Sequence, residues 1–183
     1  MEAKIRRWEL AGAIFIILVG SALHFAFARS GYWRPMAVVA PVNESVWEHL
    51  KLGFWPGLAF TLIEYAALRK RVNNYWIAKS AALFSIPALI VALFYAYTAI
   101  AGDNVLAADI VVFVVSVGVG QWISYRTLLA QKAPSSIGGM AVVALVIMVA
   151  AFSLLSYHPL RLSLFRDPVT GEYGILDAYP VNH

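Results

Sequence analysis

The sequence predicts an all-α integral membrane protein, a bundle of about five transmembrane helices. Hydrophobic residues make up 61% of the chain and charged residues 13%, whereas soluble domains carry about 45–50% apolar and about 25% charged residues. The hydrophobic residues also form long runs, and a helix needs about 20 apolar residues to cross a bilayer core. Such runs occupy most of the 183 residues, which indicates one membrane domain without a separate soluble domain.

The first expected span covers residues 8–28 and follows Lys4, Arg6 and Arg7. Its apolar run exceeds the roughly 7–15 residues of a signal-peptide core, which favours an uncleaved helix. The remaining spans are expected at residues 45–68, 75–100, 109–130 and 137–157. Because the links between the last four spans are short, sequential helices should be antiparallel neighbours. Residues 1–157 then form the transmembrane domain, and residues 158–183 form a polar tail or lid.

The distribution of Lys and Arg predicts the orientation, because cytoplasmic loops carry the excess of positive charge. With the N-terminus inside, nine basic residues lie on the cytoplasmic side and five on the outer side. Five spans then place the C-terminal tail outside. The chain is expected in the cell membrane as a multi-pass protein, in contact with the lipid bilayer and open to self-association.

Composition also excludes several kinds of site. The chain has no cysteine, which rules out disulfides, thiolate metal sites and a cysteine nucleophile. Its formal charge of +4 is modest, and the basic residues lie where membrane topology puts them. Nucleic acid is therefore not an expected partner.

Polar residues concentrate at the outer start of the second span. Glu44 and Glu48 are four residues apart and share a helix face, and Ser45 and His49 form a second such pair about 100° around the helix. Glu48 and His49 are the candidate catalytic acid and base. Histidine and carboxylate also suit a divalent metal such as zinc, and the candidate ligands at this depth are His24, Glu44, Glu48, His49 and His158.

A plainer interpretation of the same segment is structural. Glu44 would complement the helix dipole, Glu48 and Lys51 would form an ion pair, and Trp47 would anchor the interface. At that depth, water is expected to solvate Glu48.

Two further groups of polar residues are candidates for a role. In the tail, Arg166 and Asp167 begin a segment with strong turn chemistry, which either forms a structural turn or folds as a lid over the outer helix ends. Deeper in the membrane, Glu64 lies at a depth comparable with Gln121 and Tyr125. An ionisable residue inside a span is a functional hypothesis by default, although a hydrogen bond from Glu64 to Gln121 or Tyr125 could simply join two helices.

Several strings resemble an uncharacterised family of small bacterial and archaeal membrane proteins. The most specific is Pro-Val-Asn-Glu-Ser-x-Trp-Glu-His-Leu-Lys at residues 41–51. The others are His24-Phe25, Ser30-Gly31, Phe54-x-Pro56, Ile63-Glu64-Tyr65, Ile123-Ser124-Tyr125 and residues 165–174. The resemblance covers most of the chain and implies a prokaryotic cell membrane and a five-helix bundle. It implies no substrate.

Two classes of function stay open on these observations. The first is a metal-assisted or acid/base hydrolase of a lipid or lipid-linked substrate at the outer leaflet. The second is a small protein that translocates an ion or solute, with the outer residues as its entrance and Glu64 as its deep site. A third interpretation is a non-catalytic membrane partner subunit. A closed pocket or metal site would favour the enzyme, and a continuous polar path from Glu48 to Glu64 would favour translocation.

Overall fold

The computed structural model describes residues 1–176, and this part of the chain is helical, as predicted. An isolated bridge between Arg166 and Tyr173 is its one β-type pairing within these residues. In chain order the elements are α1 (Glu2–Leu23), α2 (Ala26–Arg29), η1 (Arg34–Val38), α3 (Val46–Leu68), α4 (Tyr75–Ala101), α5 (Leu106–Leu129), α6 (Ser135–Leu154) and η2 (Ser163–Phe165).

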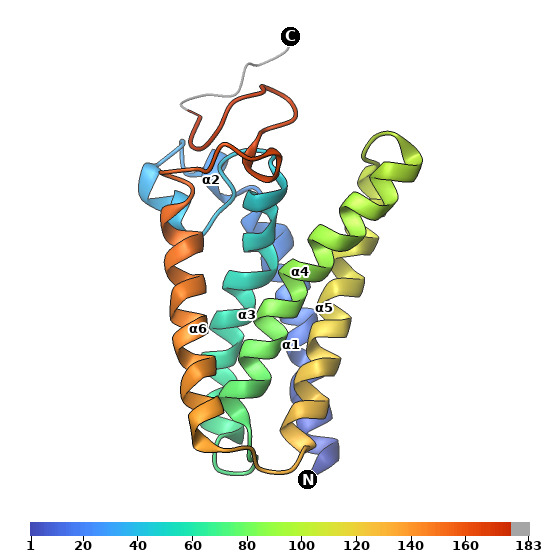
Figure 1. Ribbon diagram of the computed structural model, residues 1–183, viewed down its shortest axis with the longest axis vertical. Coiled ribbons are helices and arrows are strands. Elements are labelled where there is room, and N and C mark those ends of the chain that lie inside the picture. Colours follow the sequence, from blue (N-terminus) through green and yellow to red (C-terminus); the bar gives the residue numbers. More distant parts are fainter. Residues whose placement is uncertain (177–183) are drawn as a thin grey trace.

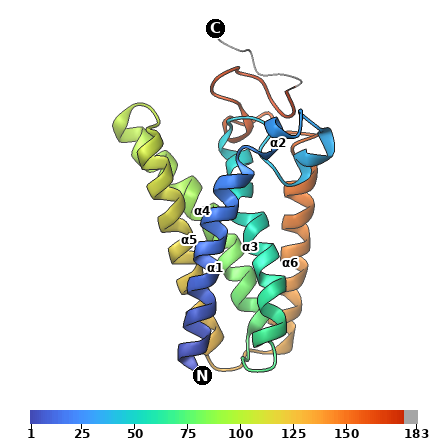
Figure 2. The same cartoon turned by 180° about the vertical axis from the view of Figure 1, so that it is seen from behind.

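The five long helices run alternately up and down (Figure 1). The N-terminus and the links at residues 69–74 and 130–134 lie at one end of the bundle, here called the base end. Helix α2, η1 and residues 155–176 cover the opposite end, here called the cap end. Both views show the cap-end halves of α4 and α5 diverging from the other helices (Figures 1 and 2).

Among residues 1–176, three helices are long and apolar enough to cross a membrane: α4, α5 and α6. This agrees with the prediction of a membrane protein. Helices α1 and α3 have comparable lengths but carry ionisable residues that the bundle buries, among them Glu9, Lys51 and Glu64. These charges lower the mean hydropathy of the two helices, and their burial means that the bundle shields them from the surroundings.

The first long helix ends earlier than the expected span 8–28. Helix α1 ends at Leu23, and the chain turns at His24 and Phe25 before the short α2. Gly31 and Tyr32 then both adopt positive φ angles, 70° and 61°. The chain then crosses the cap end into η1. Because α1 ends at Leu23, His24 lies at a helix end instead of within a helix.

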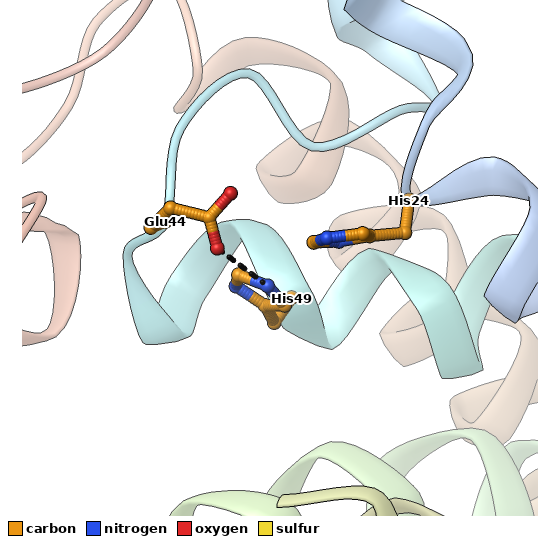
Figure 3. A group of neighbouring side chains, drawn as sticks. All are labelled: His24, Glu44 and His49. Atoms are coloured by element: carbon orange, nitrogen blue, oxygen red, sulfur yellow. Dashed lines mark ion pairs between the residues drawn. The ribbon is translucent and has the colours of Figure 1, made fainter. Parts of the chain in front are cut away.

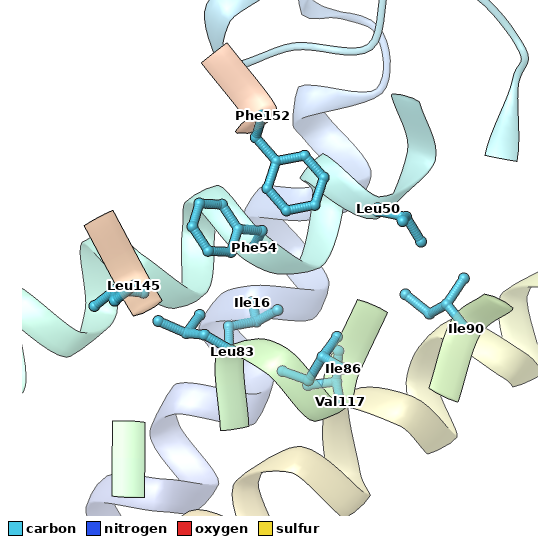
Figure 4. Packing of buried hydrophobic residues seen from close by; sticks show 9 residues of the cluster. All are labelled: Ile16, Leu50, Phe54, Leu83, Ile86, Ile90, Val117, Leu145 and Phe152. Carbon is cyan, nitrogen blue, oxygen red and sulfur yellow. The ribbon is translucent and has the colours of Figure 1, made fainter. Parts of the chain in front are cut away.

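A continuous apolar core joins the five long helices (Figure 4). Its buried members come from α1, α3, α4, α5 and α6 and include Ile16, Phe54, Ile86, Val117 and Phe152. A second cluster seals the base end around Ile5, Leu68, Tyr75, Ala78 and Leu128. A third lies under the cap around Phe27, Ala37, Ala40 and Val42. The two clusters at the ends enclose the polar groups described below.

Glycine permits the close contact between α1 and α3. A Cβ atom at Gly20 would lie 2.4 Å from the backbone oxygen of Leu52, a distance that only a backbone shift can relieve. By contrast, a Cβ at Gly118 on α5 would meet no atom within 4 Å.

We predict that Gly20→Ala lowers the stability of the bundle by about 1–3 kcal/mol, the usual cost of overpacking a close contact. Gly118→Ala is the matched control and should be neutral or slightly stabilising, because alanine favours the helix. Thermal unfolding in detergent measures both variants. Equal unfolding temperatures for the two would show that α1 and α3 are not packed this closely.

Candidate functional site

The segment before α3 is shaped by its own side chains. Ser45 is the N-cap of α3, and its hydroxyl accepts a hydrogen bond from the backbone N–H of Glu48. Asn43 accepts a hydrogen bond from the backbone N–H of Ser45 (2.9 Å) and donates one to the carbonyl of Gly174 (2.8 Å). These hydrogen bonds join the loop before α3 to Gly174 near the end of the described chain. They also hold Glu44 above the first turn of α3.

Three of the predicted metal ligands come together at the cap end. His24 follows α1, Glu44 precedes α3, and His49 lies in the first turn of α3. One ligand atom from each lies within 4.8 Å of the others. Figure 3 shows the imidazole of His49 between the Glu44 carboxylate and the ring of His24. Two histidines and one glutamate are a known ligand set of catalytic zinc, which leaves a further coordination position open.

The contacts of His49 determine which of its ring nitrogens can bind a metal ion. Nδ1 lies 2.9 Å from the carbonyl oxygen of Ser45, and because a carbonyl only accepts, Nδ1 carries a proton. Nε2 faces Glu44 Oε2 at 3.3 Å, so a proton or a metal ion has to lie between the two atoms. Tetrahedral zinc separates neighbouring ligand atoms by roughly 3.4 Å, and backbone hydrogen bonds commonly orient metal-binding histidines in this way.

The other two side chains also fit a cation. Nδ1 of His24 is buried and has no hydrogen-bond partner among the described residues, although the ring lies 5.1 Å from that of His49 between centroids. The hydrogen bond with His49 lowers the pKa of Glu44 below its ordinary value, so Glu44 is ionised at neutral pH. The site therefore offers a carboxylate and an imidazole nitrogen that lacks a partner.

A cleft of about 230 Å³ adjoins these residues. His24, Asn43 and Glu44 supply its polar groups, and its other lining residues are Phe25, Phe27, Ala28, Tyr32, Pro41 and Val42. Drug-sized ligands occupy pockets of roughly 300–1,000 Å³. The cleft therefore matches a small head group or a single segment of a larger molecule.

Glu48 lies apart from this group, in a buried ionic cluster. Its carboxylate accepts hydrogen bonds from Lys51 Nζ (2.8 Å), the Ser156 hydroxyl (2.6 Å) and the backbone N–H of Val42 (3.1 Å). Lys51 Nζ also donates to Ser156 Oγ (2.5 Å) and to the carbonyl of Ala37 (2.7 Å). The cluster ties α3 to η1 and to the end of α6.

The expectation that water solvates Glu48 was wrong. Glu48 is 2% exposed and Lys51 is not exposed at all, because η1 and residues 39–42 cover them. Each carboxylate oxygen of Glu48 already has a protein partner, which leaves it poorly suited to bind a metal or to accept a proton from water. The ion pair expected from the sequence is present, with Ser156 as a third member that sequence spacing could not reveal.

The remaining predicted residues lie elsewhere. His158 is exposed and is not part of the group of three. Asp167 is buried in the turn of the tail, where it accepts hydrogen bonds from Val169 and Thr170, and Arg166 donates to the carbonyl of Gly171. The tail packs on the cap end through stacking of Phe165 on Trp47. Residues 177–183 of the predicted tail lie outside the described part of the chain.

The deeper polar residues form a second buried cluster at the base end. Lys79 contacts the carboxylates of both Glu64 and Glu9, and Ser124 donates to Glu9 (2.9 Å). Gln121 lines a small adjacent cavity, whereas Tyr125 packs against the apolar cluster at the base end.

Glu64 was predicted from the sequence as a deep ionisable residue. Glu9 and Lys79 were not predicted as members of this cluster. A usable signal was present in α1. Ile5, Glu9, Gly12, Ile16 and Gly20 are spaced like one buried helix face, so the pattern itself places the Glu9 carboxylate inside the bundle.

The chain belongs to a family of unknown function (DUF6512), whose match extends over residues 1–175. This agrees with the resemblance to an uncharacterised family. No curated protein and no solved structure gives a significant match to the chain.

We predict that Lys51→Met destabilises the protein by about 3–5 kcal/mol, because it leaves the Glu48 carboxylate buried without its counter-charge. Adding Glu48→Gln should recover a large part of this loss, since the double variant buries no charge at the site. Thermal unfolding in detergent measures the coupling between the two positions.

Lys70→Met makes the same chemical change at an exposed position of the base end and serves as the control. If the double variant is no more stable than Lys51→Met alone, the ion pair does not hold the cap in place.

Proposed function

We propose that this member of the DUF6512 family is a metal-dependent hydrolase of the outer membrane leaflet, with its metal bound by His24, Glu44 and His49. The observation that carries the proposal is the arrangement of His49, whose Nδ1 is committed to a backbone carbonyl while Nε2 faces a carboxylate oxygen. A zinc ion bound there would supply Lewis-acid activation of water and of an ester group.

The protein residues would bind and orient the reactants. Glu44 directs one carboxylate oxygen at His49 and leaves the other turned away (Figure 3), so this second oxygen can accept a proton from an attacking water. The water oxygen then forms a bond to the acyl or phosphoryl centre, the ester bond breaks, and the proton passes to the leaving oxygen. We assign Glu48 and His158 no part in this chemistry, because they lie outside the group.

The substrate class follows from the cleft beside the ligands. Its lining is mainly apolar and aromatic, and its volume is too small for a whole lipid. We infer that an ester group at the junction of a head group and its apolar chain enters the cleft, while the rest of the substrate stays in the bilayer.

The translocation hypothesis receives less support from the packing. Between the cap-end ionic cluster and Glu64, α3 contributes Phe54 to the apolar core, where its ring packs against Phe152 at 4.7 Å between centroids. This packed hydrocarbon lies between the two polar layers, and it supports the hydrolase proposal over translocation, which needs a continuous polar path between them.

We infer further that α1 and α3 also cross the membrane, which gives five spans, with the base end in the cytoplasm. Apart from Lys79 and Lys51, which are buried against carboxylates, eight basic residues lie toward the base end and four toward the cap end. This asymmetry supports a cytoplasmic base end, and the proposed metal site would then lie at the outer face of the cell membrane.

We predict that protein purified without chelator contains stoichiometric zinc or a similar divalent metal. His24→Ala and His49→Ala should lose the metal, since each removes one of three ligands. His158→Ala is the matched control and should keep it. Elemental analysis of detergent-purified protein gives the metal content of all four proteins.

Activity is tested with vesicles of mixed phospholipids and lipid-linked sugars, whose products are identified by mass spectrometry. Metal-loaded protein should release an ester-hydrolysis product that chelated protein and His49→Ala do not release. A parent protein that binds no metal when supplied with zinc would overturn the metal assignment. A metal-loaded protein that hydrolyses none of these lipids would leave a metal-binding protein of another kind.

We predict that reporter fusions place the N-terminus in the cytoplasm and the C-terminus outside, because an odd number of spans separates the ends. Fusions in the link at residues 69–74 should report the cytoplasm. Both ends on one side would contradict the five-span arrangement and would leave the metal site without an assigned membrane face.

A further inference from the structure

The base-end cluster buries more negative than positive charge. Lys79 Nζ lies 2.6 Å from Glu9 Oε1 and also contacts Glu64 Oε2. The three residues are 3%, 4% and 0% exposed for Lys79, Glu9 and Glu64 respectively. They come from α4, α1 and α3, and together they are called the base-end triad. Two carboxylates share one ammonium, so the fully ionised triad carries a net charge of −1.

The neighbouring side chains do not remove this excess. Ser124 of α5 donates to Glu9 Oε1, and Gln121 of α5 is uncharged. The hydroxyl of Tyr75 on α4 is occupied, because it donates to the carbonyl of Thr61 (2.5 Å). The sequence of α6 contains no titratable residue. Glu9 Oε2 and Glu64 Oε1 are both buried, and neither has a hydrogen-bond partner in the described part of the chain.

Bulk water cannot compensate the charge either. Toward the base end, Ile5, Leu68, Tyr75, Ala78 and Leu128 form an apolar seal. Toward the cap end, the main apolar core begins. Between them lies a cavity of about 10 Å³ lined by Thr61, Lys79 and Gln121 together with apolar side chains. This volume is about the size needed for a single water molecule.

The cap-end cluster, in the same bundle, is an ionic group whose charges balance. There, Glu48 and Lys51 have equal and opposite charges, and both oxygens of Glu48 accept hydrogen bonds. The base-end triad lacks one positive charge and has two carboxylate oxygens without partners. An unpaired carboxylate in surroundings of low polarity takes up a proton instead of staying ionised.

We propose that the base-end triad is a proton-binding site, in which Glu9 and Glu64 share a single proton and Lys79 is the fixed counter-charge. The proton is a solvent proton: a hydronium ion transfers it to one carboxylate oxygen, an O–H bond forms there, water is left behind, and the triad becomes neutral. A proton fits better than a metal cation because the Lys79 ammonium already occupies the position between the two carboxylates. The neighbouring cavity can hold the water that delivers the proton.

The site joins four helices, which gives proton binding a structural consequence. Lys79 links α4 to α1 and α3, and Ser124 adds α5 through Glu9. Loss of the proton would leave an uncompensated charge at this junction. The protonation state of the triad is therefore coupled to the packing of the base end, independently of any metal at the cap end.

Infrared difference spectroscopy of protein in detergent tests the proposal, because a protonated carboxyl gives a carbonyl band that a carboxylate lacks and that shifts in D₂O. At neutral pH ordinary glutamates are ionised, with a reference pKa of about 4.3. The parent protein should nevertheless show a band equivalent to one carboxyl. Glu64→Gln and Glu9→Gln should each lose it, since either change balances the remaining charges.

Glu2→Gln changes an exposed carboxylate of the same helix as Glu9 and should keep the band. Lys79→Met, if it folds, should double the band, because two carboxylates then lack a counter-charge. Should one Gln variant fail to fold, the other still decides the outcome. The proposal is overturned if the parent shows no protonated carboxyl at neutral pH, or if the band persists in a folded Glu9→Gln or Glu64→Gln variant.

Discussion

The need to compensate buried charge within the protein governs this bundle. An ionised side chain among apolar helices costs several kcal/mol unless a counter-charge and hydrogen bonds surround it. At the cap end, Glu48, Lys51 and Ser156 meet this requirement completely. Because Lys51 also binds the carbonyl of Ala37, the ion pair fixes η1 and the loop that follows it. The positions of Glu44 and the cleft depend on that loop.

Neighbouring residues of one helical turn consequently serve different purposes. Glu48 points into the bundle and holds the cap in place, whereas His49, one position further along α3, points toward Glu44 and His24. The step of about 100° between successive residues separates the two directions. A buried ion pair thereby supports a more exposed group of candidate ligands, much as outer hydrogen bonds orient the ligands of metal sites in general.

The helical architecture and much of the site could be predicted from composition and spacing. Long apolar runs predicted the long helices. The depth expected for His24, Glu48 and His49 predicted that all three lie close together, and the structure brings the rings of His24 and His49 together. The role of Glu48 was misjudged, because one-dimensional spacing places it at the interface and does not reveal that η1 covers it. Glu9 and Lys79 were missed as partners for a related reason. They are 70 residues apart in the sequence, and only the packing of α1 against its neighbours brings them into contact.

The sequence by itself determined that this chain is helical, that its helices suit a membrane, and that its ionisable residues gather toward the two ends of the bundle. These properties follow from hydropathy and helical periodicity, which are local. The tertiary structure alone decided which charges neutralise each other inside the bundle and which carboxylate lines the cleft at the cap end. Glu44 and Glu48 have similar chemistry and lie four residues apart, yet one is exposed and the other buried. The difference arises because burial and pairing depend on contacts outside the helix, with η1 and with Ser156, which lies 108 residues from Glu48 in the sequence.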